Sequence, residues 1–464
     1  MRIIVQLGAI LLLVMLGACT EKSTTSSTQE QSIDVNGKSF AADTTTILVP
    51  ENMHSPEGPK LQLSVVVFHS PHPNDSTPLF LFNGGPGISN LQLHSENYFL
   101  TTRDIVLVGY RGIDSVPPLS LNDELQRKVQ LLRPSEFTPK NYLEFKKRLT
   151  SVIRQLKSSG HDLAGYTIDN VCADIDAVRI ALGYQQIDVY GVSFGTRIVQ
   201  ALLTHYPTTV RRALMVLPGA PDDYYGTSGS FQQTIQQLSE QFANANGLDT
   251  VRLNSLASTA DGRLLLARYQ SELSIVARQK SVLEQLQSMG ADSSPNENGG
   301  NDSEVRANTR DKNSVNQPPP DSSSLLQRYL LLGSLPALQN NALDAFTIPA
   351  GQFVQRPLYA FDSDIVSTVR KAAKITVQPT HPGQFSGKVL LISGAQDPFD
   401  PPNRAKEKLL PLYPNGRLLV FANTAHEIPR ISGYWPMLES YLHNGSVNTT
   451  LFDPHGFAQY GRNQ

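Results

Sequence analysis

The segment GVSFG at residues 191–195 constrains the fold more than any other feature of this chain. It has the pattern G-x-S-x-G, and it stands between a stretch typical of a strand, 187–190, and a stretch typical of a helix, 194–203. A serine on such a sharp turn from strand to helix presents its hydroxyl at the edge of a sheet. The two glycines remove side chains that would collide in the turn. Without its flanking elements, the pattern alone would be weak evidence in a chain of 464 residues.

Strand and helix patterns alternate on both sides of this turn. Short apolar stretches rich in β-forming residues predict strands, and apolar residues at every third or fourth position predict helices. The predicted strands are 61–69, 78–82, 104–108, 187–190, 212–217, 388–393 and 417–422. The predicted helices beside them are 170–182, 194–203, 402–410 and 433–442. Such alternation predicts a mostly parallel sheet with helices on both faces.

The alternation is interrupted in the middle of the chain. Helical patterns predominate there, most clearly at 231–242, 264–286 and 325–332. Residues 292–323 contain almost no large apolar side chains, so we expect a disordered or mobile surface insertion without a binding role. We therefore assign residues 34–222 and 383–464 to a core that is discontinuous in sequence, and residues 223–382 to an inserted helical cap.

An acid and a histidine that follow the serine turn much later in the chain complete a candidate catalytic constellation. A hydroxyl becomes a good nucleophile when a histidine, itself held by a carboxylate, takes its proton. With this kind of turn, the acid and then the histidine follow the serine in the chain. Asp397 and His426 each follow the end of a predicted strand, where open α/β sheets carry their sites. We expect Ser193, Asp397 and His426 to form a catalytic triad, with Asp400 as the alternative acid.

A glycine-rich segment, NGGPG at residues 83–87, follows the predicted strand 78–82. A tetrahedral oxyanion needs two backbone N–H donors. Phe194 directly follows the nucleophile and is expected to supply one of them. We expect Gly85 to supply the other, because glycines let the backbone approach a substrate closely. The alternative is that this segment is only a tight turn.

Together these segments resemble the prolyl and tripeptidyl aminopeptidase family, whose members have the α/β-hydrolase fold. The resemblance covers 60–222 and 385–445. The family's His-Gly-Gly-Pro-Gly loop resembles 83–87, its Asp-x-Arg-Gly segment 109–112, its helix, strand and serine turn 174–196, its Gly-x-x-Asp-x-x-x-Pro loop 394–401, and its histidine loop Ala425-His426. The resemblance implies a serine exopeptidase that releases residues from peptide N-termini, with no metal or organic cofactor.

The chain departs from the family pattern at two positions. Asn83 stands in place of the histidine of the glycine loop, and Gly109 in place of the aspartate before Arg111. Neither is a triad position, so these departures concern substrate selection. Arg111 is expected to brace the loop near the site by hydrogen bonds.

The implied exopeptidase needs acidic side chains in the cap to hold the ammonium group of its substrate. The candidates are Asp222, Asp223 and Glu240. The alternative for each of them is a solvated carboxylate on a cap helix or loop, without a role in binding.

The N-terminus has the pattern of an exported bacterial lipoprotein. Arg2 precedes an apolar run, 3–16, which is shorter than the roughly 20 residues of a membrane-spanning helix and typical of a signal peptide. The small residues before Cys19 resemble a lipobox, which implies cleavage there and a lipid on Cys19. The alternative is an ordinary signal peptide with a chance cysteine. We expect a signal peptide at 1–18 and a polar tether at 19–33.

The same pattern predicts a lipid-anchored protein of the bacterial cell envelope. An aspartate directly after the lipidated cysteine would resemble an inner-membrane retention signal. This chain has Thr20 at that position, so the outer membrane is the expected destination. The expected partners are this membrane and a peptide or small acyl substrate.

Composition excludes several other classes of function. The net charge is −2, and no basic region indicates nucleic-acid binding. The only cysteines are Cys19 and Cys172, so there is no disulfide framework, and Cys172 is expected to be a small buried hydrophobe. Two alternatives to a peptidase stay open: an esterase or lipase with the same triad, and a non-catalytic surface binding protein. An acidic cap pocket would favour the peptidase, and an apolar groove the esterase.

Overall fold

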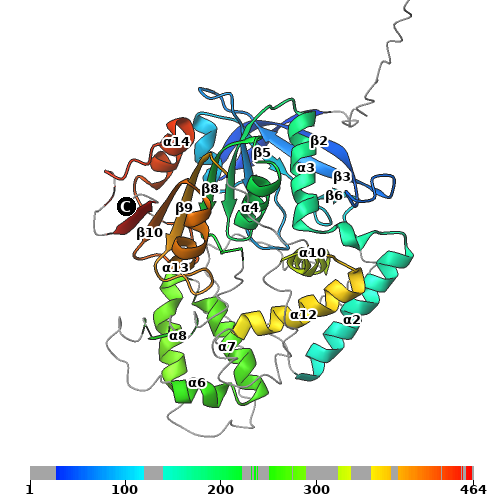
Figure 1. Cartoon of the computed structure of the whole chain (residues 1–464), viewed down its shortest axis with the longest axis vertical. Coiled ribbons are helices and arrows are strands. Elements are labelled where there is room, and N and C mark those ends of the chain that lie inside the picture. The colour runs from blue at the N-terminus through cyan, green and yellow to red at the C-terminus, as the bar shows by residue number, and fades with distance from the viewer. Residues whose placement is uncertain are drawn as a thin grey trace, which may run out of the picture.

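One continuous sheet forms the centre of the computed structural model (Figure 1). The described residues are 28–119, 139–221, 231, 235–236, 238, 250–273, 275–288, 322–335, 357–377, 385–429, 431–450, 452 and 456–461. The predicted signal peptide with Cys19, the cap acids Asp222, Asp223 and Glu240, and residues 292–321 of the predicted insertion lie outside them, while its last two residues, Ser322 and Ser323, are described as part of a helix.

The sheet has eleven strands, and its order is β1-β2-β3-β5-β4-β7-β8-β9-β10-β11, with β6 paired to β3. The strands are β1 (Gln29–Val35), β2 (Lys38–Pro50), β3 (Lys60–Phe68), β4 (Leu79–Phe82), β5 (Ile105–Val108), β6 (Ser115–Val116), β7 (Ile187–Val192), β8 (Val210–Val216), β9 (Lys388–Gly394), β10 (Asn415–Phe421) and β11 (Phe457–Gly461). The strands from β5 to β10 in this order are parallel. The other strands pair antiparallel at the two sides. The predicted sheet with its parallel centre is therefore confirmed.

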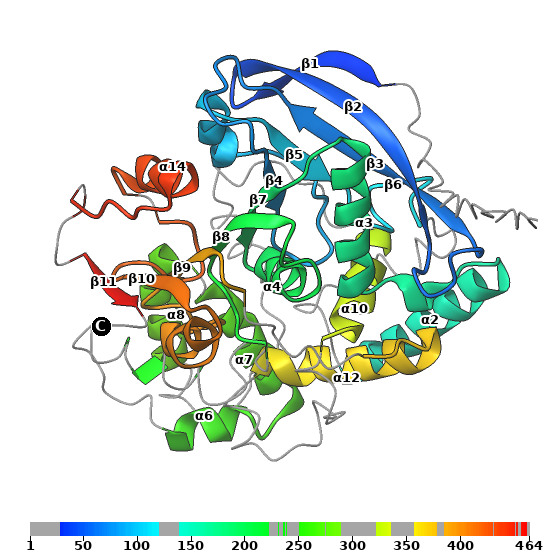
Figure 2. The same cartoon turned by 45° about the horizontal axis from the view of Figure 1, so that its top comes forward.

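The central strands are apolar on both faces, as strands covered on both sides must be. In β4 every side chain is buried. Phe80 and Phe82 belong to one hydrophobic cluster, and Leu79 and Leu81 to the other. Helices α3 (Ile168–Ala181) and α4 (Gly195–His205) pack in the first cluster, while η1 (Ser95–Thr101) and α14 (Tyr434–Asn444) pack in the second (Figure 2). Between β9 and β10 along the chain lie α13 (Pro402–Arg404), η5 (Ala405–Leu409) and η6 (Leu410–Leu412).

A group of helices lies beyond one end of the sheet, in the lower part of Figure 1. We call it the cap. Its described helices are α2 (Pro139–Ser158), α6 (Thr250–Leu256), α7 (Ala260–Glu272), α8 (Val276–Ser288), α10 (Ser322–Gly333) and α12 (Pro357–Ala373). The turn η3 (Leu163–Gly165) connects α2 to α3.

Helix α2 packs with the cap, although residues 34–222 were assigned to the core. Its Tyr142 hydroxyl donates to Asp364 Oδ2 of α12 at 2.8 Å, and Lys146 Nζ lies 2.8 Å from the same oxygen. A segment that precedes the serine turn in sequence is thus part of the cap.

Two further elements differ from the expectations. The predicted helix 264–286 is two helices, α7 and α8, and the Gln279 side chain of α8 donates to the carbonyl of Leu273 just after α7 ends. Residues 29–33 of the predicted tether belong to β1, which pairs with β2 along its whole length. Among the helices of the described residues, none has the length and apolar character needed to cross a membrane.

Candidate active site

The serine turn joins β7 to α4 at the end of the sheet that faces the cap. Ser193 has a φ of 52°, a left-handed conformation that is rare for residues other than glycine. A Cβ added at Gly195 would lie 2.1 Å from the Phe82 carbonyl oxygen, and one added at Gly191 would lie 2.6 Å from the Gly195 oxygen. Only glycines fit at these two positions, so the turn is held tightly between β4 and α4.

The three predicted triad residues lie in one hydrogen-bonded chain. Ser193 Oγ is 2.8 Å from His426 Nε2, and His426 Nδ1 is 2.7 Å from Asp397 Oδ2. These distances are those of a nucleophile, a base and an orienting acid in mutual contact. The structure therefore brings together residues that are far apart in sequence.

The loops that carry the acid and the histidine are bonded to each other. The N–H of Gln396 donates to the carbonyl of Thr424 at 3.0 Å. A Cβ added at Gly394 would lie 2.3 Å from the carbonyl oxygens of Thr424 and Ala425, so the two loops touch through backbone. This close contact fixes the separation of the acid from the histidine.

The Asp397 carboxylate is fully buried, and both its oxygens are used. Oδ2 faces His426, while Oδ1 accepts the N–H groups of Phe399 at 2.8 Å and Asp400 at 3.0 Å. The alternative acid, Asp400, instead has its Oδ1 4.0 Å from Arg197 Nη2. Asp397 is therefore the acid that contacts the histidine.

The surroundings of His426 favour its protonated form. Burial acts to lower the pKa of His426, but the charge of Asp397 and the hydrogen bond to it, together with the charge of Asp400, outweigh burial and raise the pKa. The Phe399 ring stands edge-on to the imidazole, with 5.0 Å between ring centroids. An acid that stabilises the imidazolium is what a general base needs once it has taken a proton.

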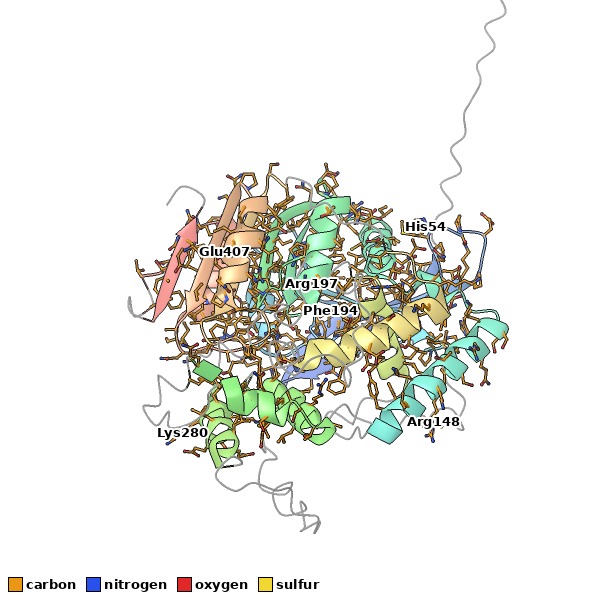
Figure 3. All side chains as sticks on the ribbon, turned by 60° about the horizontal axis from the view of Figure 1, so that its bottom comes forward. His54, Arg148, Phe194, Arg197, Lys280 and Glu407 are labelled. Carbon is orange, nitrogen blue, oxygen red and sulfur yellow. The ribbon has the colours of Figure 1, made fainter. Side chains whose placement is uncertain are left out.

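The glycine loop, residues 83–87, lies directly against the nucleophile. A Cβ added at Gly84 would stand 3.1 Å from the Cβ of Ser193. Gly85 has a φ of 117° and Gly87 a φ of 92°, a region that disfavours other residues. Phe194 is the N-cap residue of α4, directly before Gly195, and Figure 3 shows it at the end of the sheet that faces the cap helices. The two segments predicted to bind the oxyanion therefore flank Ser193.

The two departures from the family pattern have different surroundings. The side chain of Asn83 donates to the carbonyl of Gln92 at 2.9 Å, so it holds its own loop. At Gly109 an added Cβ would lie only 2.5 Å from the Cβ of Asp114, which leaves no room for a side chain. Asp114 accepts the backbone N–H of Asn90, whose side chain in turn contacts Asn83, and neither residue was singled out in the sequence.

Arg111 was expected to brace the loop near the site, but its guanidinium instead holds α3 and the segments around Glu51 and Gly165. Its guanidinium is buried and makes a bidentate contact with Asp174, at 2.9 Å from Nε and 2.6 Å from Nη2. Nη1 donates to the carbonyls of Glu51 at 2.5 Å and Gly165 at 2.7 Å. With its donors used in this way, Arg111 has a structural role.

Cys172 is fully buried, which confirms that it is a core residue, and burial raises the pKa of its thiol well above the usual value. Within the part of the chain that the structure describes, no three His, Cys, Asp or Glu side chains are grouped as metal ligands would be.

Comparison with known proteins places this geometry in a family. Residues 77–429, more than half of the chain, match the family model described as alpha/beta hydrolase fold. The serine protease Hip1 of Mycobacterium tuberculosis is 30% identical over 190 residues, which cover 38% of this chain and 35% of that protein. A tripeptidyl aminopeptidase of Streptomyces lividans is 25% identical over 185 residues, which cover 36% of this chain and 34% of that protein. The match thus spans about a third of the length of these relatives.

Among solved structures, an esterase from Exiguobacterium antarcticum is 14% identical with a TM-score of 0.34, and the match covers 83% of this chain and 96% of that one. Likeness at this level bears on neither substrate nor activity.

Proposed function

This chain belongs to the α/β hydrolase fold family, and we propose that it is a serine hydrolase that works through an acyl-enzyme on Ser193. Ser193 Oγ attacks the substrate carbonyl carbon, while His426 takes the proton and later returns it to the leaving group. Asp397 orients His426 and stabilises its charged form. The N–H groups of Phe194 and Gly85 bind the oxyanion, and water then hydrolyses the acyl-enzyme.

The observation that carries this proposal is the continuous chain of hydrogen bonds from serine to histidine to aspartate, with 2.8 Å and 2.7 Å between the bonded atoms. The position of Ser193 also supports the serine hydrolase proposal, because this residue lies on the strand-to-helix turn and the glycine loop lies beside it. The proposal needs neither a metal nor an organic cofactor for any step.

We further propose that the substrate is a peptide with a free N-terminus. The names of the two relatives, a serine protease and a tripeptidyl aminopeptidase, support this choice. The cap acids Asp222, Asp223 and Glu240 are our candidates for binding the ammonium group of such a substrate. Carboxylates would hold it by charge-assisted hydrogen bonds.

A substrate panel tests the choice of substrate. It contains chromogenic amides of proline, alanine and tripeptides with free N-termini, the same amides with blocked N-termini, and short acyl esters, with Ser193→Ala as the control. Hydrolysis of the free amides but not of the blocked ones, absent in the control, is the result that we expect. Hydrolysis of esters alone would contradict the peptidase proposal and leave the serine hydrolase standing.

We also propose that the mature chain is anchored in the bacterial cell envelope through a lipid on Cys19, in the outer membrane. The small residues before Cys19 support this proposal. Metabolic labelling with an alkyne fatty acid should tag the wild type and not Cys19→Ala. Equal labelling of both chains would contradict the anchor, and fractionation of the membranes would test its location.

A further inference from the structure

The first residue of the glycine loop is held at both of its backbone groups by side chains from outside the loop. The N–H of Asn83 donates to Asn90 Oδ1 at 2.8 Å. The carbonyl of Asn83 accepts the hydroxyl of Tyr110 at 3.1 Å. The next residue is Gly84, which packs against Ser193. The orientation of this peptide beside the nucleophile is therefore set by Asn90 and Tyr110.

Asn90 is itself held on all sides. Its side chain is completely buried, and its amide nitrogen donates to the carbonyls of Leu81 at 3.0 Å and Val108 at 2.8 Å. These carbonyls belong to the ends of β4 and β5, so the amide bridges two neighbouring strands. With both hydrogens of the amide bonded and its oxygen accepting from Asn83, the side chain has one permitted orientation.

Asp114 links Asn90 to Tyr110. Its Oδ2 accepts the backbone N–H of Asn90 at 2.9 Å and that of Tyr110 at 2.8 Å. Asp114 is buried, so its carboxylate makes these charge-assisted bonds with little competition from water. One carboxylate thus fixes the backbone of both residues that hold the glycine loop.

The position of Asp114 also accounts for Gly109. Its Cβ lies 2.5 Å from the place where a Cβ at residue 109 would stand. The carbonyl oxygen of Ser64 lies 2.8 Å from the same place. The side chain of Asp114 and the backbone of Ser64 therefore leave room only for a glycine at position 109.

We propose that Asp114, acting through Asn90 and Tyr110, is a positioning residue that sets the orientation of the oxyanion-binding loop. This inference rests on the serine hydrolase function proposed above. An oxyanion hole works only when its N–H groups already point to where the negative charge develops. A displacement of about 1 Å in a catalytic group can lower the rate by about 100-fold.

The least disruptive test removes one hydroxyl. Tyr110→Phe keeps the buried ring and deletes only the bond to the carbonyl of Asn83. Tyr441→Phe is the matched control, because its buried hydroxyl also donates to a backbone carbonyl, that of Ala213 at 3.2 Å, and has no bond to the glycine loop. Steady-state and burst kinetics with p-nitrophenyl acetate, together with thermal melting, are measured for both variants.

We expect Tyr110→Phe to lower kcat by about 10- to 100-fold with KM changed by less than about 2-fold, because only the transition state develops the oxyanion. The control should keep kcat within about 2-fold, with a melting temperature as low as that of Tyr110→Phe. A kcat for Tyr110→Phe equal to that of the wild type or of the control would overturn the proposal.

A second variant tests the carboxylate itself. Asp114→Gly removes the two acceptor bonds that hold the backbone of Asn90 and Tyr110. We expect this variant to lower kcat by at least about 10-fold with KM changed by less than about 2-fold, because the oxyanion-binding loop is no longer held. An Asp114→Gly variant with the kcat of the wild type would contradict the positioning role of the carboxylate.

The outcomes separate this inference from the proposed function. A wild type without a burst and without labelling of Ser193 by a fluorophosphonate would contradict the hydrolase function, and the positioning role with it. A labelled wild type with an unimpaired Tyr110→Phe variant would contradict the positioning role alone.

Discussion

At Ser193 the backbone is held in a conformation that few residues other than glycine adopt, and the surroundings enforce it. The N–H of Ser193 donates to the carbonyl of Val216 at 2.9 Å, and its own carbonyl accepts the Thr196 hydroxyl at 2.6 Å. Gly195 allows α4 to begin against the carbonyl of Phe82. The nucleophile is therefore fixed by β8 and α4 before any substrate arrives, which is the preorganisation that a serine hydrolase needs.

The choice between the two candidate acids is tested by replacing each of them. Asp397→Asn removes the acceptor of His426 Nδ1, and we expect kcat to fall by about 10⁴-fold, because the imidazole is no longer held in its working tautomer. Asp400→Asn removes a charge that only adds to the field at His426, so its effect should be far smaller. Turnover of p-nitrophenyl acetate measures both. A larger loss of kcat for Asp400→Asn than for Asp397→Asn would contradict the assignment of Asp397 as the acid.

The raised pKa of His426 predicts how activity depends on pH. Catalysis needs the neutral imidazole, and a pKa raised above 6.5 keeps the ring protonated up to a higher pH. Activity is therefore lost as pH falls through this raised value. In Asp397→Asn the main cause that raises the pKa is absent, so the acidic limb of kcat/KM should move to lower pH. Profiles from about pH 5 to about pH 9 test this, and an unmoved limb would contradict it.

At the scale of elements, apolar strands and the serine turn could be predicted from the sequence, because their burial on both faces leaves continuous apolar runs. Strands β1 and β2 were not predicted, because their exposed residues are mostly polar and leave no continuous apolar run. The signal that could have found them is Asn36-Gly37, a tight hairpin turn with φ values of 54° and 76°. Helix α2 was also missed, although Tyr142, Phe145 and Leu149 recur at helical spacing and are buried.

The pairing of α2 with the cap can be measured at Asp364 of α12. Asp364→Ala removes the carboxylate that contacts both Tyr142 and Lys146, and we expect a loss of about 1–3 kcal/mol in the free energy of unfolding, because the buried Tyr142 hydroxyl loses its 2.8 Å bond and keeps only the 3.4 Å contact to the carbonyl of Phe361 among its bonds to α12. Glu144→Ala is the control, since it breaks only an exposed pair with Arg148 on the same helix and should cost less than about 0.5 kcal/mol. Urea unfolding that gives equal losses would mean that α2 is not anchored there.

At the scale of the whole molecule, two buried glutamines tie the cap to the loops of the catalytic face. Gln327 of α10 donates to the carbonyl of Arg111 at 3.2 Å, and Gln279 of α8 donates to the carbonyl of Gln396 at 3.4 Å. Outer residues of the cap, such as Lys280 and Arg148, lie on its far side in Figure 3.

The sequence predicts that a cap is inserted, because its pattern changes from alternating strands and helices to helices alone. It could not predict these bonds, since a glutamine that pairs with a backbone carbonyl far along the chain leaves no periodic signal. The hydrogen bond between Asn90 and Asp114 could not be predicted either, because it also joins a side chain to a backbone group far along the chain. The triad could be predicted because its residues follow strand ends in a fixed order, which is visible in the sequence.

Labelling with a fluorophosphonate probe tests the central claim most directly, because the probe reacts with an activated serine whatever the natural substrate is. The wild-type chain should carry one adduct, on Ser193 by peptide mass spectrometry. Ser193→Ala should carry none, and His426→Ala should react at least about 10³-fold more slowly. A wild-type chain that stays unmodified, or an Ser193→Ala variant that is labelled as fast as the wild type, would contradict the account.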